Sequence, residues 1–303
     1  MKKQTTGHHN TIDSVASRER MLPLQEDFFT VPLEPNLALR VCADSRPHNL
    51  KTTQLQKGLI LILNGKELIE EGTGFGVPVG IYSDDTYFSS SAQVLIDRDG
   101  QNKVIVKRFL MDTISKKNWK IEAFVQNPLY KSIEKRVGRF YRDHPVSQKL
   151  ILSLNTLNKK MGIKSSFVKT ESRGEVIITY RIKNNDIKVE VNLTKLNKRR
   201  LDRVAILNEQ GSTFFRRFAD SNGSNSIDHE INAWNLVKAE WACLSDLDNT
   251  LGFCLKNLPN SKMFVGREYF MEELLAWAGI EYEVISNLDI FNYEIKICME
   301  KDV

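Results

Sequence analysis

A β-hairpin signal near residue 60 constrains the fold more than any other feature of the chain. In "GLILILNGKELIEEG", residues 58–72, two apolar runs flank Asn64-Gly65. Asn-Gly supplies the two residues of positive φ that a type I′ hairpin turn requires. Short apolar runs follow at close spacing, separated by the turn-forming segments "SDD", "RDGQN" and "SKKN". Because no helical crossover separates these runs, they predict an antiparallel meander.

The middle of the chain has a different periodicity. Between residues 145 and 162 the apolar side chains recur at helical spacing, with Pro145 at the start and Gly162 just past the end. Proline is favoured in the first turn of a helix and glycine after the last. Together with the segment from residue 128, this pattern predicts a short helical insertion over 128–162.

Strand patterns return after the insertion and continue towards the C-terminus. "GEVIITYRIKNNDIKVEVNL", residues 174–193, indicates a second hairpin whose turn is "NND". Apolar and charged residues alternate along its second arm, as expected of a strand with one buried face. Residues 267–279 fit either a short helix or an edge strand, and we favour the strand.

These elements predict a mainly β fold: a large antiparallel β-sandwich with a short helical insertion. At 303 residues the chain is long enough to bury a sizeable core. We expect residues 26–303 to form one domain after a disordered, polar tail of residues 1–25. No apolar stretch follows the two lysines at the start, so no secretory signal is predicted. No run of 18 apolar residues exists, so no membrane span is expected.

The four cysteines give information about the cellular location of the protein but do not indicate a metal site. Cys42, Cys243, Cys254 and Cys298 are scattered, and no histidine stands at metal-ligand spacing from them. Such cysteines are typical of reduced, mostly buried thiols in a cytoplasmic protein. We therefore expect a cytoplasmic location and no metal site. We also expect no cofactor.

Charge is distributed unevenly along the chain. Residues 98–223 contain 28 Lys and Arg against 12 Asp and Glu, a net charge of +16, whereas residues 224–303 contain 6 against 14, a net charge of −8. This division indicates either a surface for a polyanion or two parts of one fold that attract each other.

The glycine-rich segment "EGTGFGVPVG", residues 71–80, raises the question of a phosphate-binding loop. Its glycines are spaced G-x-G-x-G, and Val77 stands where a dinucleotide-binding motif needs a third glycine. No Gly-Lys-Ser/Thr follows, so it is not a P-loop either. Glycine at every second residue leaves one face of a strand bare. That suits a bent strand packed under its neighbour or a platform for a flat ligand.

The "GFGVP" strand, the following "YSDDTYF" and strands such as "VKAEWACLSD" resemble the galactose-mutarotase-like superfamily of β-supersandwiches over residues 28–285. The resemblance implies a sugar on the concave face of the sandwich, commonly contacted by His, Glu, Arg and aromatic side chains. The paired catalytic histidines of the enzyme members have no counterpart here, because His229 is the only histidine beyond residue 144. Whether the chain is an enzyme therefore stays open.

One segment supplies two candidate sugar-binding residues. In "ILNEQGSTFFRRFAD", residues 206–220, Glu209 follows an apolar strand and Arg216 has aromatic neighbours. We expect a strand over 214–220 in which Arg216 shares a face with two phenylalanines and Arg217 faces the opposite way. An arginine beside an aromatic ring can bind a carboxylate or a sugar hydroxyl. The simpler alternative is a surface arginine pair.

The remaining candidates are carboxylate and aromatic residues with one histidine: Asp85, Tyr87, His229, Trp234, Glu240 and Trp241. A tryptophan beside a carboxylate is common in sugar sites, because the ring contacts the apolar face of the sugar while the acid accepts its hydroxyls. The alternatives are tryptophans that lie in the core and a pair of aspartates that only forms a turn.

Our leading hypothesis is a protein that binds or modifies a glycan on the concave face of a β-sandwich. The alternative is a non-enzymatic module that binds a polyanion or an acidic partner protein through its basic half. The most basic segment, "KLNKRRLDR" at residues 195–203, has no interleaved aromatic residue, so a nucleic acid is not the expected ligand. The sequence gives no indication of the oligomeric state.

Overall fold

A computed structural model describes residues 21–23, 28–42, 46–47, 55–69, 73–97, 103–118, 164–227, 234–270 and 275–299. Most of the predicted tail over 1–25 and the whole predicted helical insertion over 128–162 lie outside these residues. The described residues form strands and turns without an α-helix, which confirms a mainly β, antiparallel fold. None of the described segments contains a helix long and apolar enough to cross a membrane.

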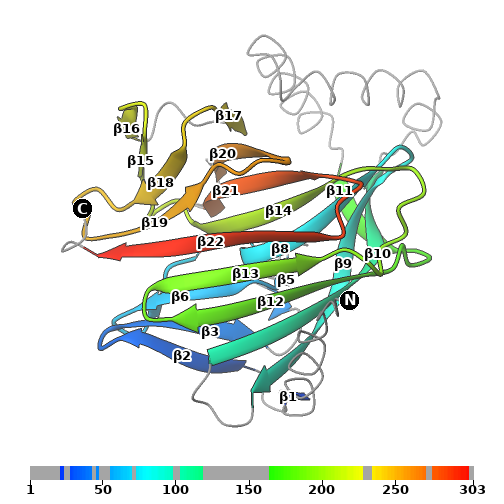
Figure 1. Cartoon of the computed structure of the whole chain (residues 1–303), viewed down its shortest axis with the longest axis horizontal. Helices are drawn as coiled ribbons and strands as arrows, with labels where there is room; N and C mark the ends of the chain where they lie inside the picture. Colours follow the sequence, from blue (N-terminus) through cyan, green and yellow to red (C-terminus); the bar gives the residue numbers. More distant parts are fainter. Residues whose placement is uncertain are drawn as a thin grey trace, which may run out of the picture.

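All pairings among the described strands are antiparallel, and they join all strands but two into one sheet whose two halves, called the first and second layer below, face each other (Figure 1). The first layer has the order β16 (Asn225–Ile227), β15 (Arg217–Asp220), β18 (Trp241–Ser245), β19 (Leu251–Lys256), β22 (Ile290–Met299), β13 (Asp186–Asn192), β12 (Glu175–Lys183), β10 (Lys103–Asn118), β9 (Thr86–Asp97) and β1 (Met21–Pro23).

The second layer has the order β2 (Phe28–Glu34), β3 (Leu37–Cys42), β6 (Leu59–Leu63), β8 (Gly74–Tyr82), β14 (Leu201–Gly211), β21 (Leu275–Ile285), β20 (Ser261–Phe270) and β17 (Asn235–Val237). β8 also pairs with β9, which joins the two layers. The short strands are β7 (Lys66–Glu67) beside β6, β11 (Lys164–Lys169) beside β10, and the separate pair β4 (Arg46–Pro47) and β5 (Leu55–Gln56).

The two layers pack face to face because their strands alternate buried and exposed residues. β22 illustrates the pattern, with buried apolar or aromatic side chains at every second position and exposed polar ones between them. Aromatic rings join the layers: Phe75 of β8 contacts Phe253 of β19 with ring centroids 5.0 Å apart, and Tyr282 of β21 contacts Tyr293 of β22 at 5.1 Å. Edge-to-face pairs of this kind stabilise a core beyond the area that they bury.

Both predicted hairpin turns are confirmed. Asn64 and Gly65 have φ values of 52° and 77°, as a type I′ turn requires, and Asn184 has a φ of 52°. The ambiguous segment over 267–279 is strand at its described residues, because it contains the end of β20 and the beginning of β21. The favoured interpretation is confirmed for these residues.

The glycine-rich segment is a bent strand packed under its neighbours. Gly74 and Gly76 of β8 have φ values of 86° and 77°, a region that side chains disfavour. A Cβ at Gly74 would lie 2.9 Å from the carbonyl oxygen of Leu59, and one at Gly76 would lie 2.8 Å from Cε1 of Tyr180. The register with β14 shifts at this point, so the strand contains a β-bulge. The structural interpretation of the glycines is confirmed at these two positions.

A buried hydrogen-bond network holds the bulge. The Oδ1 atom of Asn208 on β14 accepts bonds from the backbone N–H of Gly76 at 3.1 Å and from the hydroxyl of Tyr293 at 2.9 Å. Its Nδ2 donates to the carbonyl of Ile280 at 3.2 Å. The hydroxyl of Tyr180 lies 2.9 Å from the carbonyl oxygen of Gly76. Asn208 therefore connects both layers through side-chain bonds that replace the ladder bonds lost at the bulge.

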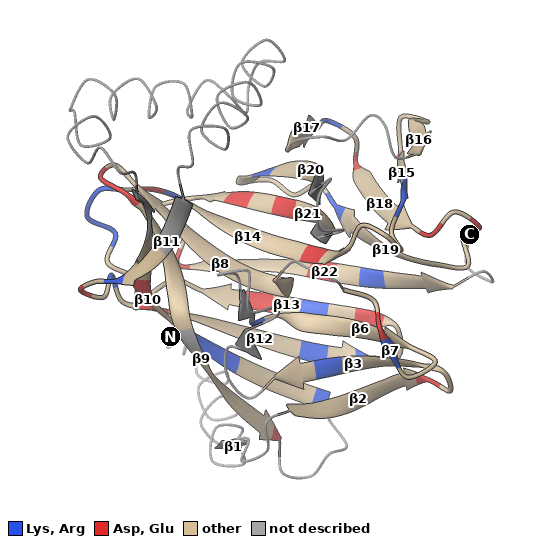
Figure 2. Ribbon diagram, turned by 180° about the vertical axis from the view of Figure 1, so that it is seen from behind, with Lys and Arg blue, Asp and Glu red and all other residues tan. Residues whose placement is uncertain are grey.

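The basic and acidic parts of the chain interleave in the same sheets. β13 and β14 come from the basic part and pair with β22 and β21 from the acidic part. Arg203 of β14 is 2.8 Å from Glu283 of β21, and Lys198 forms an ion pair with Asp289. Figure 2 shows basic and acidic residues mixed along β12, β13 and β22, with acidic residues on β21. Part of the charge asymmetry is therefore neutralised within the fold.

Candidate functional site

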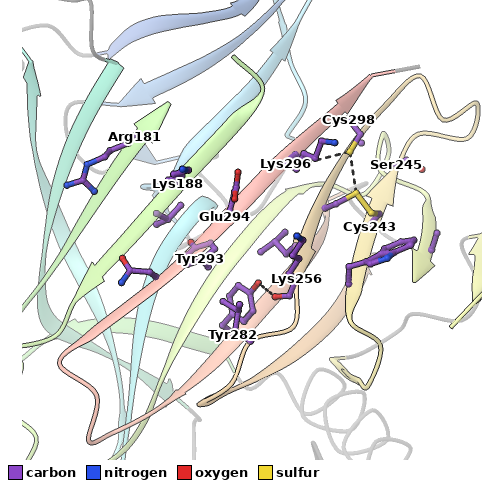
Figure 3. Close-up of a pocket in the computed structure, with 18 of the residues that line it drawn as sticks. Arg181, Lys188, Cys243, Ser245, Lys256, Tyr282, Tyr293, Glu294, Lys296 and Cys298 are labelled. Atoms are coloured by element: carbon purple, nitrogen blue, oxygen red, sulfur yellow. Dashed lines mark hydrogen bonds between the residues drawn. A yellow bond between two sulfur atoms is a disulfide. The ribbon is translucent and has the colours of Figure 1, made fainter. Parts of the chain in front are cut away.

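A groove of about 890 Å³ lies over the first layer, where β12, β13, β22, β19 and β18 run side by side (Figure 3). Many of its lining residues are the outward members of the alternating strands: Arg181, Lys188, Glu190, Trp241, Cys243, Ser245, Cys254, Lys256, Asn292, Glu294, Lys296 and Cys298. Strand alternation explains the set, because the intervening residues of each strand are buried between the layers.

Several charged groups of the groove form no ion pair with any residue that the structure describes. Lys188 of β13 stands directly opposite Glu294 of β22 in the strand register, yet the two side chains form no salt bridge. Lys256 and Lys296 also make none among the described residues. Within the described part of the groove, the one ion pair is that of Arg181 with Glu190, at 3.5 Å and largely in solvent. The groove therefore presents hydrogen-bonding groups of both signs, with lysines in excess.

Trp241 is the large aromatic side chain at the edge of the groove. It is 37% exposed, and its residue pairs with Lys256 across β18 and β19. Tyr282 and Tyr293 also contribute to the lining, but burial raises the pKa of both phenols well above the ordinary value. The hydroxyl of Tyr282 donates to the carbonyl of Lys256 at 2.5 Å. These tyrosines support the floor of the groove, whereas Trp241 offers its ring to solvent.

The sulfur atoms on the floor correct the expectation of four reduced thiols. Cys243 of β18 and Cys254 of β19 are directly opposite each other and form a disulfide. The sulfur of Cys298 on β22 lies 3.4 Å from that of Cys254 (Figure 3). Cys42, buried in β3, is remote in the fold from this cluster. Scattered positions concealed the pairing, because only the strand order places residues 243, 254 and 298 side by side. The cytoplasmic location rested on reduced thiols and stays a prediction.

Of the predicted site residues that the structure describes, Trp241 alone lines the groove. Glu240 precedes it at a bend, where its exposed side chain is not part of the lining and its backbone N–H bonds to Oγ of Ser221 at 2.8 Å. His229 lies outside the described residues.

Asp85 and Tyr87 lie together in a different place, at the hairpin between β8 and β9. Asp85 accepts a bond from the backbone of Thr86 at 2.8 Å, which fits the turn interpretation. Tyr87 is buried, and the guanidinium of Arg173 lies 4.8 Å from the centre of its ring. Arg173 also pairs with Asp84. This cluster fastens the hairpin to the neighbouring loop.

The expected strand over 214–220 is wrong for its first residues. β15 begins only at Arg217, and residues 214–216 form a turn and a short connection. The reason is a local bond: the backbone N–H of Phe215 donates to the carbonyl of Gly211 at 3.0 Å, which closes the chain on itself. The predicted alternation of Arg216 and Arg217 therefore does not apply. Arg217 instead bonds Oδ1 of Asn225 at 2.8 Å.

Two other predicted residues, Glu209 and Trp234, lie on the same face of the second layer on either side of Gly279 and Gly266. Glu209 of β14 stands opposite Gly279 of β21, which pairs with Gly266 of β20. Trp234 packs over Gly266, and its ring stacks on that of Trp277 at 4.8 Å between centroids. Glu209 is 4% exposed and accepts two bonds of 2.9 Å from Thr73.

Glu209, Glu281 and Trp277, on this face of the second layer, are too buried to contact a ligand. Glu281, on the same face of β21 as Gly279, is fully buried, and Trp277 is 7% exposed. Tryptophans and carboxylates share this face, but the carboxylates are Glu209 and Glu281 rather than the predicted Glu240, and both are buried. No group of three or more metal-ligating side chains occurs among the described residues.

Comparisons with known proteins give little further information. No family model matches the chain, and no curated protein matches it. Among solved structures, the Slr1438 protein from Synechocystis sp. PCC 6803 matches 92% of this chain and 98% of its own, with 7% sequence identity and a TM-score of 0.39.

Proposed function

We propose that the groove on the first layer binds a carbohydrate, with the ring of Trp241 as the platform for one sugar residue. The observation that carries the proposal is a tryptophan exposed by 37% at the edge of a groove whose lysine and glutamate side chains are not neutralised by each other. The C–H face of a sugar packs on an aromatic ring, and charged or amide groups bond its hydroxyls.

The groove offers both kinds of contact on adjacent strands. Trp241 and Lys256 are opposite each other on β18 and β19, and Asn292, Glu294 and Lys296 follow on β22. A hydroxyl can donate to Glu294 and accept from Lys296 within one sugar unit. The proposal concerns binding; it assigns no catalytic residue. The supersandwich resemblance is part of the same proposal, and the antiparallel strands are consistent with it. The helical insertion over 128–162 stays a prediction from the sequence.

Substitution of single tryptophans tests the location. We expect Trp241→Ala to weaken binding to the preferred oligosaccharide of an array by roughly 10- to 100-fold, because ring stacking is lost. Leu236→Ala is the matched control, since Leu236 is 39% exposed on β17, outside the groove. Binding that survives Trp241→Ala but is lost in Trp234→Ala would place the sugar on the second layer and contradict the groove.

The excess of lysines favours a second candidate, an anionic ligand. Lys188, Lys256 and Lys296 line the groove without ion pairs among the described residues. Binding through charge alone weakens steeply with salt, whereas stacking on Trp241 does not. Arrays of neutral and uronic-acid oligosaccharides at low and high salt separate the two. Equal losses from Lys188→Gln and Lys296→Gln that vanish at high salt, with no effect of Trp241→Ala, would favour the polyanion.

A further inference from the structure

Three cysteines on neighbouring strands meet on the floor of the groove. The Cys243–Cys254 disulfide joins β18 to β19, which lies next to β22 in the same sheet. Cys254 pairs with Lys296, and Cys298 is two residues further along β22, so it lies on the same face as Cys254. The two sulfur atoms are 3.4 Å apart, and all three cysteines are half-buried and line the groove (Figure 3).

This geometry is close to that of an alternative disulfide, between Cys254 and Cys298. A sulfur–sulfur bond is about 2.05 Å long, so Cys254 and Cys298 need to approach by only about 1.4 Å to form one. Cys298 is not part of a disulfide, and one contact of its thiol is a weak bond of 3.8 Å to the carbonyl of Lys296. A thiolate attacks a disulfide sulfur directly and needs no external oxidant.

We propose that Cys243, Cys254 and Cys298 form a thiol–disulfide exchange site. The Cys298 thiol loses its proton to solvent, and its sulfur attacks Cys254 to form a Cys254–Cys298 bond. The Cys243–Cys254 bond breaks, and Cys243 leaves as a thiolate that takes up a proton. One disulfide and one thiol are present before and after, so no electron enters or leaves. Lys296 and Lys256, beside Cys254 on this face, are positive neighbours of the kind that favours thiolates.

The exchange changes what the disulfide holds together. One state fastens β18 to β19, and the other fastens β19 to β22. In the second state the thiol of Cys243 is open to reaction, two residues from Trp241 on the same face of β18. The exchange therefore changes which strands are covalently linked beneath the groove and which cysteine presents a free thiol there. It stands independently of the carbohydrate proposal, because it needs no ligand.

Peptide mapping of the full chain tests the exchange. The protein is held at pH 8, quenched in acid, alkylated and digested. Trypsin leaves Cys243 and Cys254 in one peptide, residues 239–256, so an Asp-specific protease is added to cut at Asp246 or Asp248. We expect wild-type protein to yield both the 243–254 and the 254–298 linkages. We also expect Cys298→Ser to lower alkylation of Cys243 by at least about tenfold, since its only exchange partner is removed.

Two results of the peptide mapping would contradict the exchange. Absence of the 254–298 linkage from wild type, or alkylation of Cys243 that is unchanged in Cys298→Ser, would overturn the proposal. Cys243→Ser gives a second measurement, because it leaves Cys254 and Cys298 as the close pair. A glutathione buffer that closes the wild-type disulfide should also close this pair, and two persistent thiols would contradict the geometry. Cys42→Ser is the matched control, because Cys42 is buried in β3 and should change neither linkage.

Discussion

The bulge around Gly76 and the groove around Lys296 use polar groups in opposite ways. At the bulge every polar atom of Asn208 is bonded, and the residues around it are buried. In the groove, Lys296 and Glu294 are exposed and form no ion pair among the described residues. Buried polar groups must be satisfied by the fold, whereas exposed ones can be left for a ligand. The difference marks the bulge as structural and supports the groove as the surface for which we propose a function.

The largest effect is expected at the bulge. We predict that Gly76→Ala lowers the free energy of unfolding by at least about 3 kcal/mol, because its Cβ would meet the ring of Tyr180 in a backbone conformation that alanine disfavours. Gly65→Ala is the matched control: Gly65 has the same φ of 77°, but nothing lies within 4 Å of its Cβ position. Its expected cost is about 1 kcal/mol. Urea unfolding of both variants gives the comparison, and equal losses would show that packing at the bulge contributes nothing.

A smaller loss is expected from the side chain that holds the bulge. Asn208→Ala leaves the N–H of Gly76 and the hydroxyl of Tyr293 buried without their acceptor, which should cost about 2–3 kcal/mol. Asn292→Ala removes the same side chain from the groove, where it is exposed, and should change the free energy by less than about 0.5 kcal/mol. Thermal melts of the two variants and of the wild type measure this difference in stability. A costly Asn292→Ala would mean that the groove is also part of the structural framework.

Local patterns in the sequence predicted much of the fold, for identifiable reasons. The Asn64-Gly65 turn depends on two adjacent residues and was therefore visible in the sequence. The glycines of β8 were interpreted correctly because G-x-G-x-G with Val77 excludes a phosphate loop. The strand over 214–216 was wrong because the bond from Phe215 to Gly211 has no signature in alternation alone.

The groove was mostly missed, because it depends on strand order. Lys188, Cys254 and Lys296 are far apart in sequence and meet only because β22 lies between β13 and β19. A weak signal was available: "DIKVEVN" and "IFNYEIKICM" both alternate polar and apolar residues, so each predicts one polar face. Which polar faces adjoin one another follows from long-range pairing, which a single sequence does not reveal.

The smallest expected change in the free energy of unfolding compares a basic residue that forms an ion pair within the fold with a groove lysine that forms none. Arg203 lies 2.8 Å from Glu283, a carboxylate whose side chain is only 8% exposed, so Arg203→Gln should cost up to about 1 kcal/mol. Lys188 stands opposite Glu294 without an ion pair, so Lys188→Gln should change the free energy of unfolding by less than about 0.5 kcal/mol.

The salt dependence of stability is the control for these two variants. Screening weakens the ion pair that Arg203→Gln removes, whereas the unpaired Lys188 has no ion pair to lose. Urea titrations of both variants at low and high salt should show the gap between them narrowing as salt rises. A loss from Lys188→Gln as large as that from Arg203→Gln would mean that Lys188 and Glu294 do pair in solution. The groove would then have fewer groups available for a ligand, and the contrast between groove and core would weaken accordingly.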